Sequence, residues 1–285
     1  MTEHILENLL DLKKVDGHHF EAPAIQDTRG RTFGGQFLGQ ALRAAQLTVD
    51  SDRSIHSLHS YFLRPGNVNQ TTSYKVETVR DGRGFSAREV RAYQSNKELF
   101  RCILSFATPH PGLEYDGPKA PKAPKPETVT YTYNDFQADI RPIESDWGGW
   151  RRPLDIRYIN PPSTSSRSSV TEDQLMWIKI NQSMGDDWQI HSAALAYLSD
   201  STLVDHVLLP HGRRWDEAGF LGASLDHSMW FHRCCRADEW LLFEQQVAWT
   251  GDGRGLAKGR LFDLSGILVA TCVQEGLLRL SLIHI

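Results

Sequence analysis

The stretch Gly222-Ala-Ser-Leu-Asp-His-Ser-Met-Trp-Phe-His232 carries more polar and reactive side chains than an ordinary core strand. Strict alternation along a strand predicts Ser224 and Asp226 on one face and His227 and Met229 on the other. Polar groups on both faces of a strand need hydrogen-bond partners on both sides. We therefore expect the rest of the fold to be organised around this stretch.

Two segments of this region have earlier counterparts. The sequence LHSYF from Leu58 resembles DHSMW from Asp226, and GRGFSAREVRAYQ from Gly82 resembles GRGLAKGRLFDL from Gly253. Both matches are about 170 residues apart, a spacing that indicates two copies of one domain rather than a short solenoid repeat. We expect a first domain over 1–108, a connection over 109–169 and a second domain over 170–285.

Each copy reads as a helix followed by an antiparallel meander. The first helix begins after Phe33-Gly-Gly-Gln36 and contains Gly35 and Gly39, small residues that allow close approach to other backbone. The strands expected after it are 55–63, 71–80, 85–94 and 98–106, separated by turn signals. In the second copy the helix is expected over 189–204, with strands over 175–180, 223–231, 240–250, 256–264 and 267–278.

The connection has a different composition. Its segments PHPGLEYDGP, PKAPKPE and PPSTSSRSS are rich in Pro, Gly and Ser and have no sustained periodicity. We expect local structure there, including a strand near Leu154 to Ile159.

Composition excludes several classes of protein. The chain has 285 residues, 40% of them apolar and 23% charged, with a formal charge of −4. These values indicate a soluble globular protein without nucleic acid as its main partner. No run approaches the length of a membrane span, and the N-terminus alternates charges with leucines, unlike a secretion signal. The four cysteines contain no C-x-x-C motif, which favours reduced thiols in a cytoplasmic protein.

Asp200 lies on the same helical stripe as Ala193, Ala196 and Tyr197, where core residues belong. A buried charge needs partners or a bordering cavity. Asp200 is therefore either a structural carboxylate that caps a loop or pairs with an Arg, or a base in a water-binding pocket.

Two further polar residues interrupt apolar strands, Ser224 and Gln274. Each could simply bond to backbone or water. The aligned positions in the first copy are His56 and Ser105, so the trio of Asp200, Ser224 and Gln274 is not duplicated. We expect one working site per chain, built mainly from the second copy.

Metal and serine-nucleophile chemistry are disfavoured. The histidines lack a recognised zinc spacing, and His227 and His232, five residues apart on a strand, point to opposite faces. The sequence has no G-x-S-x-G motif, and its pattern is not one of alternating strands and helices.

Several motifs in order resemble the acyl-CoA thioesterase II family: FGGQ, HSLHSYFLRPG, GRGFSAR, SLDHSMWFHR, EWLLFE, GRGLAKGRLFD and VQEG. The resemblance covers residues 33–107 and 175–278. It implies an α+β fold of two tandem hotdog domains, each a long helix wrapped by an antiparallel sheet. It also implies hydrolysis of medium- to long-chain fatty acyl-CoA to free fatty acid and CoA, without a covalent acyl-enzyme and without metal or cofactor.

In that family an Asp, a Ser or Thr and a Gln hold the attacking water, and the matching residues of this chain are Asp200, Ser224 and Gln274. The resemblance further implies a homo-oligomer, a dimer or tetramer, with no stable membrane insertion. The C-terminal LSLIHI differs from the S-K-L peroxisomal address, so we expect a cytoplasmic protein.

Two other functions are considered. One is a hotdog enoyl-CoA hydratase with an Asp and His pair, which the opposite orientation of Asp226 and His227 disfavours. The other is an acyl-CoA binding module without chemistry.

Overall fold

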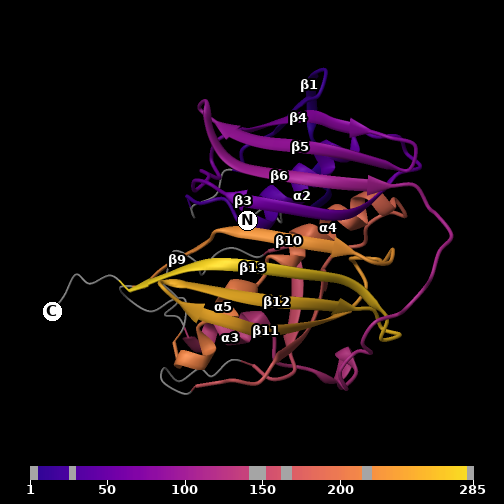
Figure 1. The fold of residues 1–285 in the computed structure, drawn as a ribbon. Helices are drawn as coiled ribbons and strands as arrows, with labels where there is room; N and C mark the ends of the chain where they lie inside the picture. The colour runs from indigo at the N-terminus through magenta and orange to yellow at the C-terminus, as the bar shows by residue number, and fades with distance from the viewer. Residues whose placement is uncertain (1–5, 26–29, 141–151, 162–168, 214–219, 281–285) are drawn as a thin grey trace.

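The computed structural model describes residues 6–25, 30–140, 152–161, 169–213 and 220–280. Their strands form one antiparallel sheet in the order β1-β2-β4-β5-β6-β3-β10-β13-β12-β11-β8-β7, with β9 paired to β13. In Figure 1 the strands of the first half, in indigo and purple, lie next to those of the second half, in orange and yellow, with β3 beside β10. The sheet passes from one copy of the repeat to the other without a break.

The first half supplies one long helix and most of its sheet as a meander. Its elements are α1 (Leu6–Leu10), β1 (Lys13–Asp16), β2 (His19–Ala22), α2 (Gly34–Gln46), β3 (Ser54–Phe62), β4 (Thr72–Asp81), β5 (Phe85–Gln94) and β6 (Lys97–Ala107). The four strands expected from alternation are present within two residues of their expected bounds. Turn signals and period-two patterns therefore determine this meander.

The second half repeats the arrangement. Its elements are β8 (Gln174–Ile180), α4 (Trp188–Ser199), α5 (Leu203–His206), η2 (Leu209–His211), β9 (Phe220–Ser224), β10 (Asp226–Phe231), β11 (Leu241–Gly251), β12 (Arg254–Phe262) and β13 (Leu268–Leu280). Between the halves lie η1 (Pro126–Thr128), α3 (Tyr133–Ile140) and β7 (Leu154–Tyr158), and β7 pairs with β8. The strand expected near Leu154 is thus present and extends the second half of the sheet.

The two copies meet at the strands that carry the matching motifs. β3 pairs antiparallel with β10, and His227 lies opposite Ser60. The Ser60 hydroxyl donates to the backbone carbonyl of His227 at 2.9 Å, which adds a side-chain bond to the ladder. The motif that organises the sequence is therefore the seam of the sheet.

Small residues let the two long helices touch. A Cβ on Gly35 would lie 2.2 Å from the backbone oxygen of Tyr197, and one on Gly39 would lie 3.0 Å from that of Ala193. No side chain fits at the first position, because real Cβ atoms essentially never approach below 3.0 Å. The close approach expected from the glycines of α2 is confirmed, and its partner is α4.

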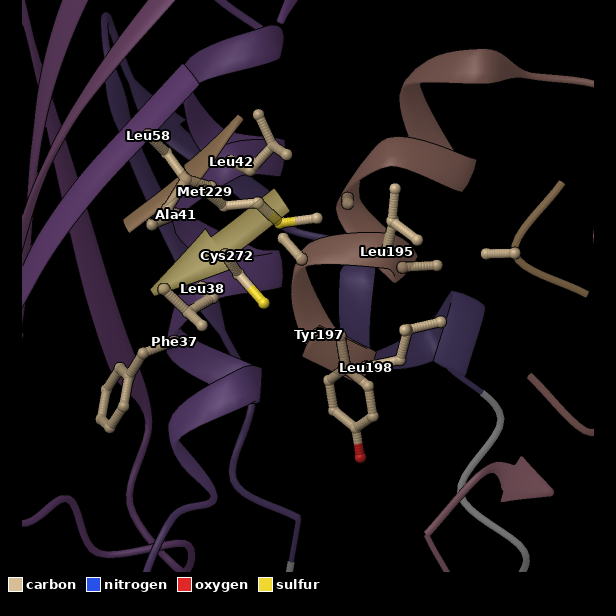
Figure 2. Close-up of a cluster of buried hydrophobic side chains, with 14 of the residues drawn as sticks. Phe37, Leu38, Ala41, Leu42, Leu58, Leu195, Tyr197, Leu198, Met229 and Cys272 are labelled. Atoms are coloured by element: carbon tan, nitrogen blue, oxygen red, sulfur yellow. The ribbon is translucent and has the colours of Figure 1, made fainter. Parts of the chain in front are cut away.

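The main apolar core of the described residues lies between the helices and the sheet, and a second, small cluster contains Trp177 and Phe262. Figure 2 shows Phe37 and Leu38 of α2 beside Tyr197 and Leu198 of α4, with Met229 and Cys272 from the central strands. Leu38, Leu198, Met229 and Cys272 are all at most 1% exposed. Burial of this kind stabilises a fold by about 1.5–3 kcal/mol for each large side chain. Among the described residues, no helix is long and apolar enough to cross a membrane.

Two local expectations were wrong, and both concern the site. The second helix ends at Ser199 rather than at Val204, and Asp200 is its C-cap. The strand expected over 223–231 is broken at Leu225 into β9 and β10. Ser224 pairs with Gly276, whereas Ser228 pairs with Val273, so one strand has an extra residue.

Candidate active site

Asp200 is presented by a tight turn at the end of α4. Thr202 adopts a left-handed conformation with φ of 65°, which few residues with a Cβ do. Gln245 of β11 stabilises this turn, because its Nε2 lies 3.0 Å from Thr202 Oγ1 and 3.2 Å from the carbonyl oxygen of Ser201. Gln245 is fully buried, so the turn is tied to the middle of the sheet. The helix end and the sheet together set the position of the carboxylate.

The Asp200 carboxylate contacts Gln274 directly. Gln274 Nε2 donates to Asp200 Oδ1 at 2.5 Å, from strand β13 to the end of α4. Gln274 is 0% exposed and Asp200 is 8% exposed. The structure therefore brings together two of the three predicted site residues in a nearly closed environment.

The N-terminus of α2 faces the same carboxylate. A Cβ on Gly34 would lie 2.6 Å from Asp200 Oδ2 and 3.1 Å from the ring of Phe62. The backbone N–H of Gly35 forms a hydrogen bond with the carboxylate. Phe33, the N-cap of α2, provides no side-chain cap, so the first N–H groups of the helix are not used by its own side chain. The glycines allow an acceptor to approach these donors.

Burial raises the pKa of Asp200 to about 6. The hydrogen bond from Gln274, the positive charge of Arg152 and the Gly35 N–H all lower it, but their combined effect is smaller. Arg152 belongs to the connection and lies over the ring of Phe33, with its guanidinium carbon 4.2 Å from the centroid. The result is a carboxylate that accepts a proton near neutral pH, as a general base requires.

Ser224 lies on the same face of the sheet as Gln274. It pairs with Gly276, and paired residues, like residues two apart on a strand, project from the same face. A Cβ on Gly276 would meet the side chain of Val204 at 2.3 Å, so this face points toward α5 and the end of α4. Within the described chain, no hydrogen bond joins Ser224 to Asp200 or Gln274.

The break at Leu225 decides which side chains share this face. Met229 pairs with Cys272, so His227 projects inward together with Met229 and Gln274. Ser224 also projects inward, because the extra residue at Leu225 shifts the alternation by one position. The expectation that Ser224 and His227 lie on opposite faces was therefore wrong, since it assumed an unbroken strand. Asp226 turns outward instead and accepts a hydrogen bond from the backbone N–H of Glu275 at 2.7 Å.

His227 completes the inner wall. It is fully buried, and burial lowers its pKa to about 3, so the imidazole is neutral. Its Nε2 lies 3.0 Å from the hydroxyl of Ser199 at the end of α4. His227 and Ser199 thus connect strand β10 to the turn that presents Asp200.

The opposite end of the helix pair has different chemistry. The N-terminus of α4 is capped by Asp187, whose carboxylate accepts the backbone N–H of Gln189 at 2.8 Å. The C-cap of α2 is Leu47, not a carboxylate, and His56 forms a hydrogen bond with Ser105 at 2.8 Å. A cavity of about 650 Å³ lies at this end. Its described lining includes neither the Asp200 carboxylate nor the N-terminus of α2. The described residues at this end therefore differ in chemistry from those around Asp200.

Sequence reasoning missed four contributors to the site: Gly34, Ser199, His227 and Gln245. The sequence indicates packing and the family resemblance for FGGQ, and for His227 only a metal ligand or a hydratase pair with Asp226, both of which it disfavours. Their roles depend on contacts between elements far apart in the chain, for which a single sequence gives no distance. Only the mismatch between polar character and apolar surroundings could have indicated Gln245.

Comparisons with known proteins identify the family. Residues 154–277 match the family model for acyl-CoA thioesterase, and residues 23–107 match that for the acyl-CoA thioesterase N-terminal domain. Acyl-coenzyme A thioesterase 8 of Mus musculus is 36% identical over 97% of this chain and 89% of its own length. Acyl-CoA thioesterase 2 of Haemophilus influenzae is 35% identical over 97% of both chains.

A solved structure has the same architecture. The acyl-CoA thioesterase II TesB2 of Mycobacterium marinum is 33% identical and superposes with a TM-score of 0.79, covering 98% of this chain and 99% of its own. The two central helices and the long antiparallel sheet are those of a double hotdog, so the α+β fold expected from the motifs is confirmed. The chain therefore belongs to the acyl-CoA thioesterase II family and is an acyl-CoA thioester hydrolase.

Proposed function

We propose that the protein hydrolyses medium- to long-chain fatty acyl-CoA to free fatty acid and CoA by direct attack of a water held by Asp200, Ser224 and Gln274. The observation that carries this proposal is the buried Asp200 carboxylate, with its pKa raised to about 6 and Gln274 Nε2 at 2.5 Å. A carboxylate in this state takes a proton from water more readily than an exposed one at neutral pH.

Each group has a role in the attack. Asp200 accepts a proton from the water as the water oxygen bonds to the thioester carbon. The C–S bond then breaks, the new oxygen stays on the fatty acid, and the CoA thiolate takes up the proton held by Asp200. Ser224 and Gln274 orient the water, which turns a poorly ordered encounter into a directed one. What supports a role for Ser224 is that it projects from the inner face of β9, the strand that pairs with the Gln274 strand β13.

The N-terminus of α2 stabilises the oxyanion. Attack turns the thioester oxygen into an alkoxide, which needs hydrogen-bond donors already in position. The Gly34 N–H, which the Phe33 side chain does not cap, supplies a donor, and the partial positive charge of the helix end adds to the effect. The neighbouring Gly35 N–H bonds Asp200, so the base and the oxyanion site lie next to each other.

Thiol release from palmitoyl-CoA, followed with a thiol-reactive dye, tests the activity. Hydrolysis releases free CoA, whereas hydration of an enoyl-CoA changes the acyl group without releasing thiol, and a binding module leaves the ligand intact. Reaction in ¹⁸O-labelled water should place one label in the fatty acid, including in a single turnover. A burst of thiol before steady state would indicate a covalent acyl-enzyme and contradict direct attack.

Three variants test the residue roles. Asp200→Asn should lower kcat by about 100- to 10,000-fold, or roughly 3–5 kcal/mol of barrier. Ser224→Ala and Gln274→Ala should lower kcat by smaller factors. Ser228→Ala is a matched control, because Ser228 lies on β10 only four residues from Ser224 but bonds His59 at 3.0 Å on the outer face. Full activity in Asp200→Asn would remove this residue from the mechanism.

The assembly and compartment stay predictions. A homo-oligomer, dimer or tetramer, is tested by light scattering on the purified chain. A cytoplasmic location is tested by imaging a tagged protein.

A further inference from the structure

A carboxamide can donate a hydrogen bond to an ionised carboxylate only through its NH2 group, so only one of its two orientations fits. Gln274 presents Nε2 to Asp200 Oδ1, because a carboxylate accepts hydrogen bonds and the amide oxygen cannot donate one. Gln274 Oε1 then lies on the other side of the amide, buried and with no assigned hydrogen bond. Leaving a buried acceptor unpaired costs about 1–3 kcal/mol. The working orientation of Gln274 therefore needs a donor for Oε1.

His227 is placed to be that donor. The pairs Ser228 with Val273 and Met229 with Cys272 put His227 beside Gln274 on the inner face. Its Nε2 is 3.0 Å from Ser199 Oγ, and its Nδ1 is buried with no assigned hydrogen bond. Burial lowers the pKa of His227 and the Gln274 carboxamide raises it, which indicates that the amide acts on the ring.

The neutral imidazole has two tautomers, and they differ in what they offer Gln274. With the proton on Nε2, the ring donates to Ser199, whose hydroxyl then donates to the Ala196 carbonyl at 2.9 Å. In that case the Nδ1 lone pair opposes Gln274 Oε1, and two acceptors face each other. With the proton on Nδ1, the ring donates to Oε1, and the single Ser199 hydroxyl proton goes to Nε2 instead of to the Ala196 carbonyl. Only this second arrangement gives both Nδ1 and Oε1 a hydrogen-bond partner.

We propose that His227 is a positioning residue: its Nδ1–H donates to Gln274 Oε1 and holds the carboxamide with its nitrogen toward Asp200. Ser199 supports this tautomer from the end of α4. The row Ser199, His227, Gln274 and Asp200 thus fixes the direction of each hydrogen bond from the helix to the base.

The effect on catalysis rests on the proposed function. If the amide turned over, Oε1 would meet Asp200 Oδ1, and the repulsion would displace the carboxylate or favour its protonated form. His227 is behind Gln274 rather than on the substrate, so its loss should lower kcat without changing KM. We expect a fall of about tenfold, the loss of one net hydrogen bond.

The tautomer can be observed without an activity measurement. Nitrogen NMR on the full chain with ¹⁵N-histidine should show His227 neutral, with a proton on Nδ1 and none on Nε2. The His227→Phe variant identifies the signals by their disappearance. A proton on Nε2 would overturn the proposal, whatever the kinetics show.

Two conservative variants separate positioning from packing. His227→Asn keeps a donor near Nδ1, whereas His227→Gln keeps one near Nε2. We expect His227→Phe and His227→Gln to lose about tenfold in kcat at unchanged KM, and His227→Asn to recover most of it. Recovery by Gln alone would contradict the assignment.

The control for these variants is His232→Asn, because the His232 ring bonds Thr271 at 2.9 Å on the exposed face. It should leave kcat unchanged. If Gln274→Ala keeps full activity while the Nδ1–H tautomer is observed, the proposed function fails and the positioning contact stands.

Discussion

Replacing Asp200 with Asn should stabilise the folded protein at neutral pH while it removes activity. Burial raises the pKa of Asp200 from 3.8 to about 6, so the folded state holds the proton more tightly than the unfolded chain does. The protonated Asp200 carboxyl therefore makes its full contribution to the unfolding free energy below pH 3.8, and this contribution is lost as the pH rises toward and through 6. The complete difference corresponds to about 3 kcal/mol. Asn carries no charge to desolvate and avoids this cost.

The substitution also has a cost of its own. The amide nitrogen that replaces one carboxylate oxygen cannot accept a hydrogen bond such as that from the Gly35 N–H, a loss of about 1 kcal/mol. That loss does not depend on pH, so the informative quantity is the difference in unfolding free energy between variant and parent at two pH values. We expect this difference to grow by about 2 kcal/mol in favour of the variant between pH 4 and pH 8.

Equilibrium unfolding in urea, followed by circular dichroism, measures the difference. Asp50→Asn is the control, because its side chain is 83% exposed and meets Arg53 at 3.5 Å. Its difference from the parent should stay within about 0.5 kcal/mol over the same range. A difference for Asp200→Asn that is constant, or that falls with pH, would show that the folded state does not disfavour the ionised carboxylate. That result would show that Asp200 is not a buried base.

Two more predictions concern the surroundings of Asp200, and a third concerns the opposite end of α4. The kcat/KM for acyl-CoA should rise with pH through an apparent pKa near 6 as Asp200 ionises, and a flat profile between pH 5 and 8 would contradict its role. Gly34→Ala places a Cβ 2.6 Å from Asp200 Oδ2 and should lower kcat at least tenfold with an unchanged circular dichroism spectrum; Gly112→Ala, with nothing within 4 Å, should not. Asp187→Ala removes the cap of α4 and should lower the unfolding free energy by about 1 kcal/mol with kcat unchanged, whereas a large fall in kcat would place catalysis at the other helix end.

Much of the fold is readable from the chain because local patterns determine it. The strands of the first meander follow from alternation and turn residues, and Gly35 and Gly39 indicate a helix that touches other backbone. The internal match of motifs about 170 residues apart shows two copies of one domain. The mismatch of Asp200 and Gln274 with their apolar neighbours marks them as candidates, and they are in contact.

Other features depend on contacts that a pattern does not record. An extra residue at Leu225 turns Ser224 to the same face as His227, and alternation alone predicts the reverse. The helix stops before Asp200 because Gln245 and the left-handed Thr202 stabilise a turn there. Both are decided by neighbours on other strands.

The amino-acid sequence by itself determined the duplicated helix-and-meander plan and the residue types able to perform hydrolysis. Only the tertiary structure decided that the helix end of the first copy meets the carboxylate of the second, with His227 and Gln274 beside it. The physical reason is the separation along the sequence over which each effect acts. Periodicity and turn chemistry act between residues near in sequence, whereas a shifted pKa and an open set of helix N–H donors arise from burial between segments that lie about 165 residues apart, as Gly35 and Asp200 do.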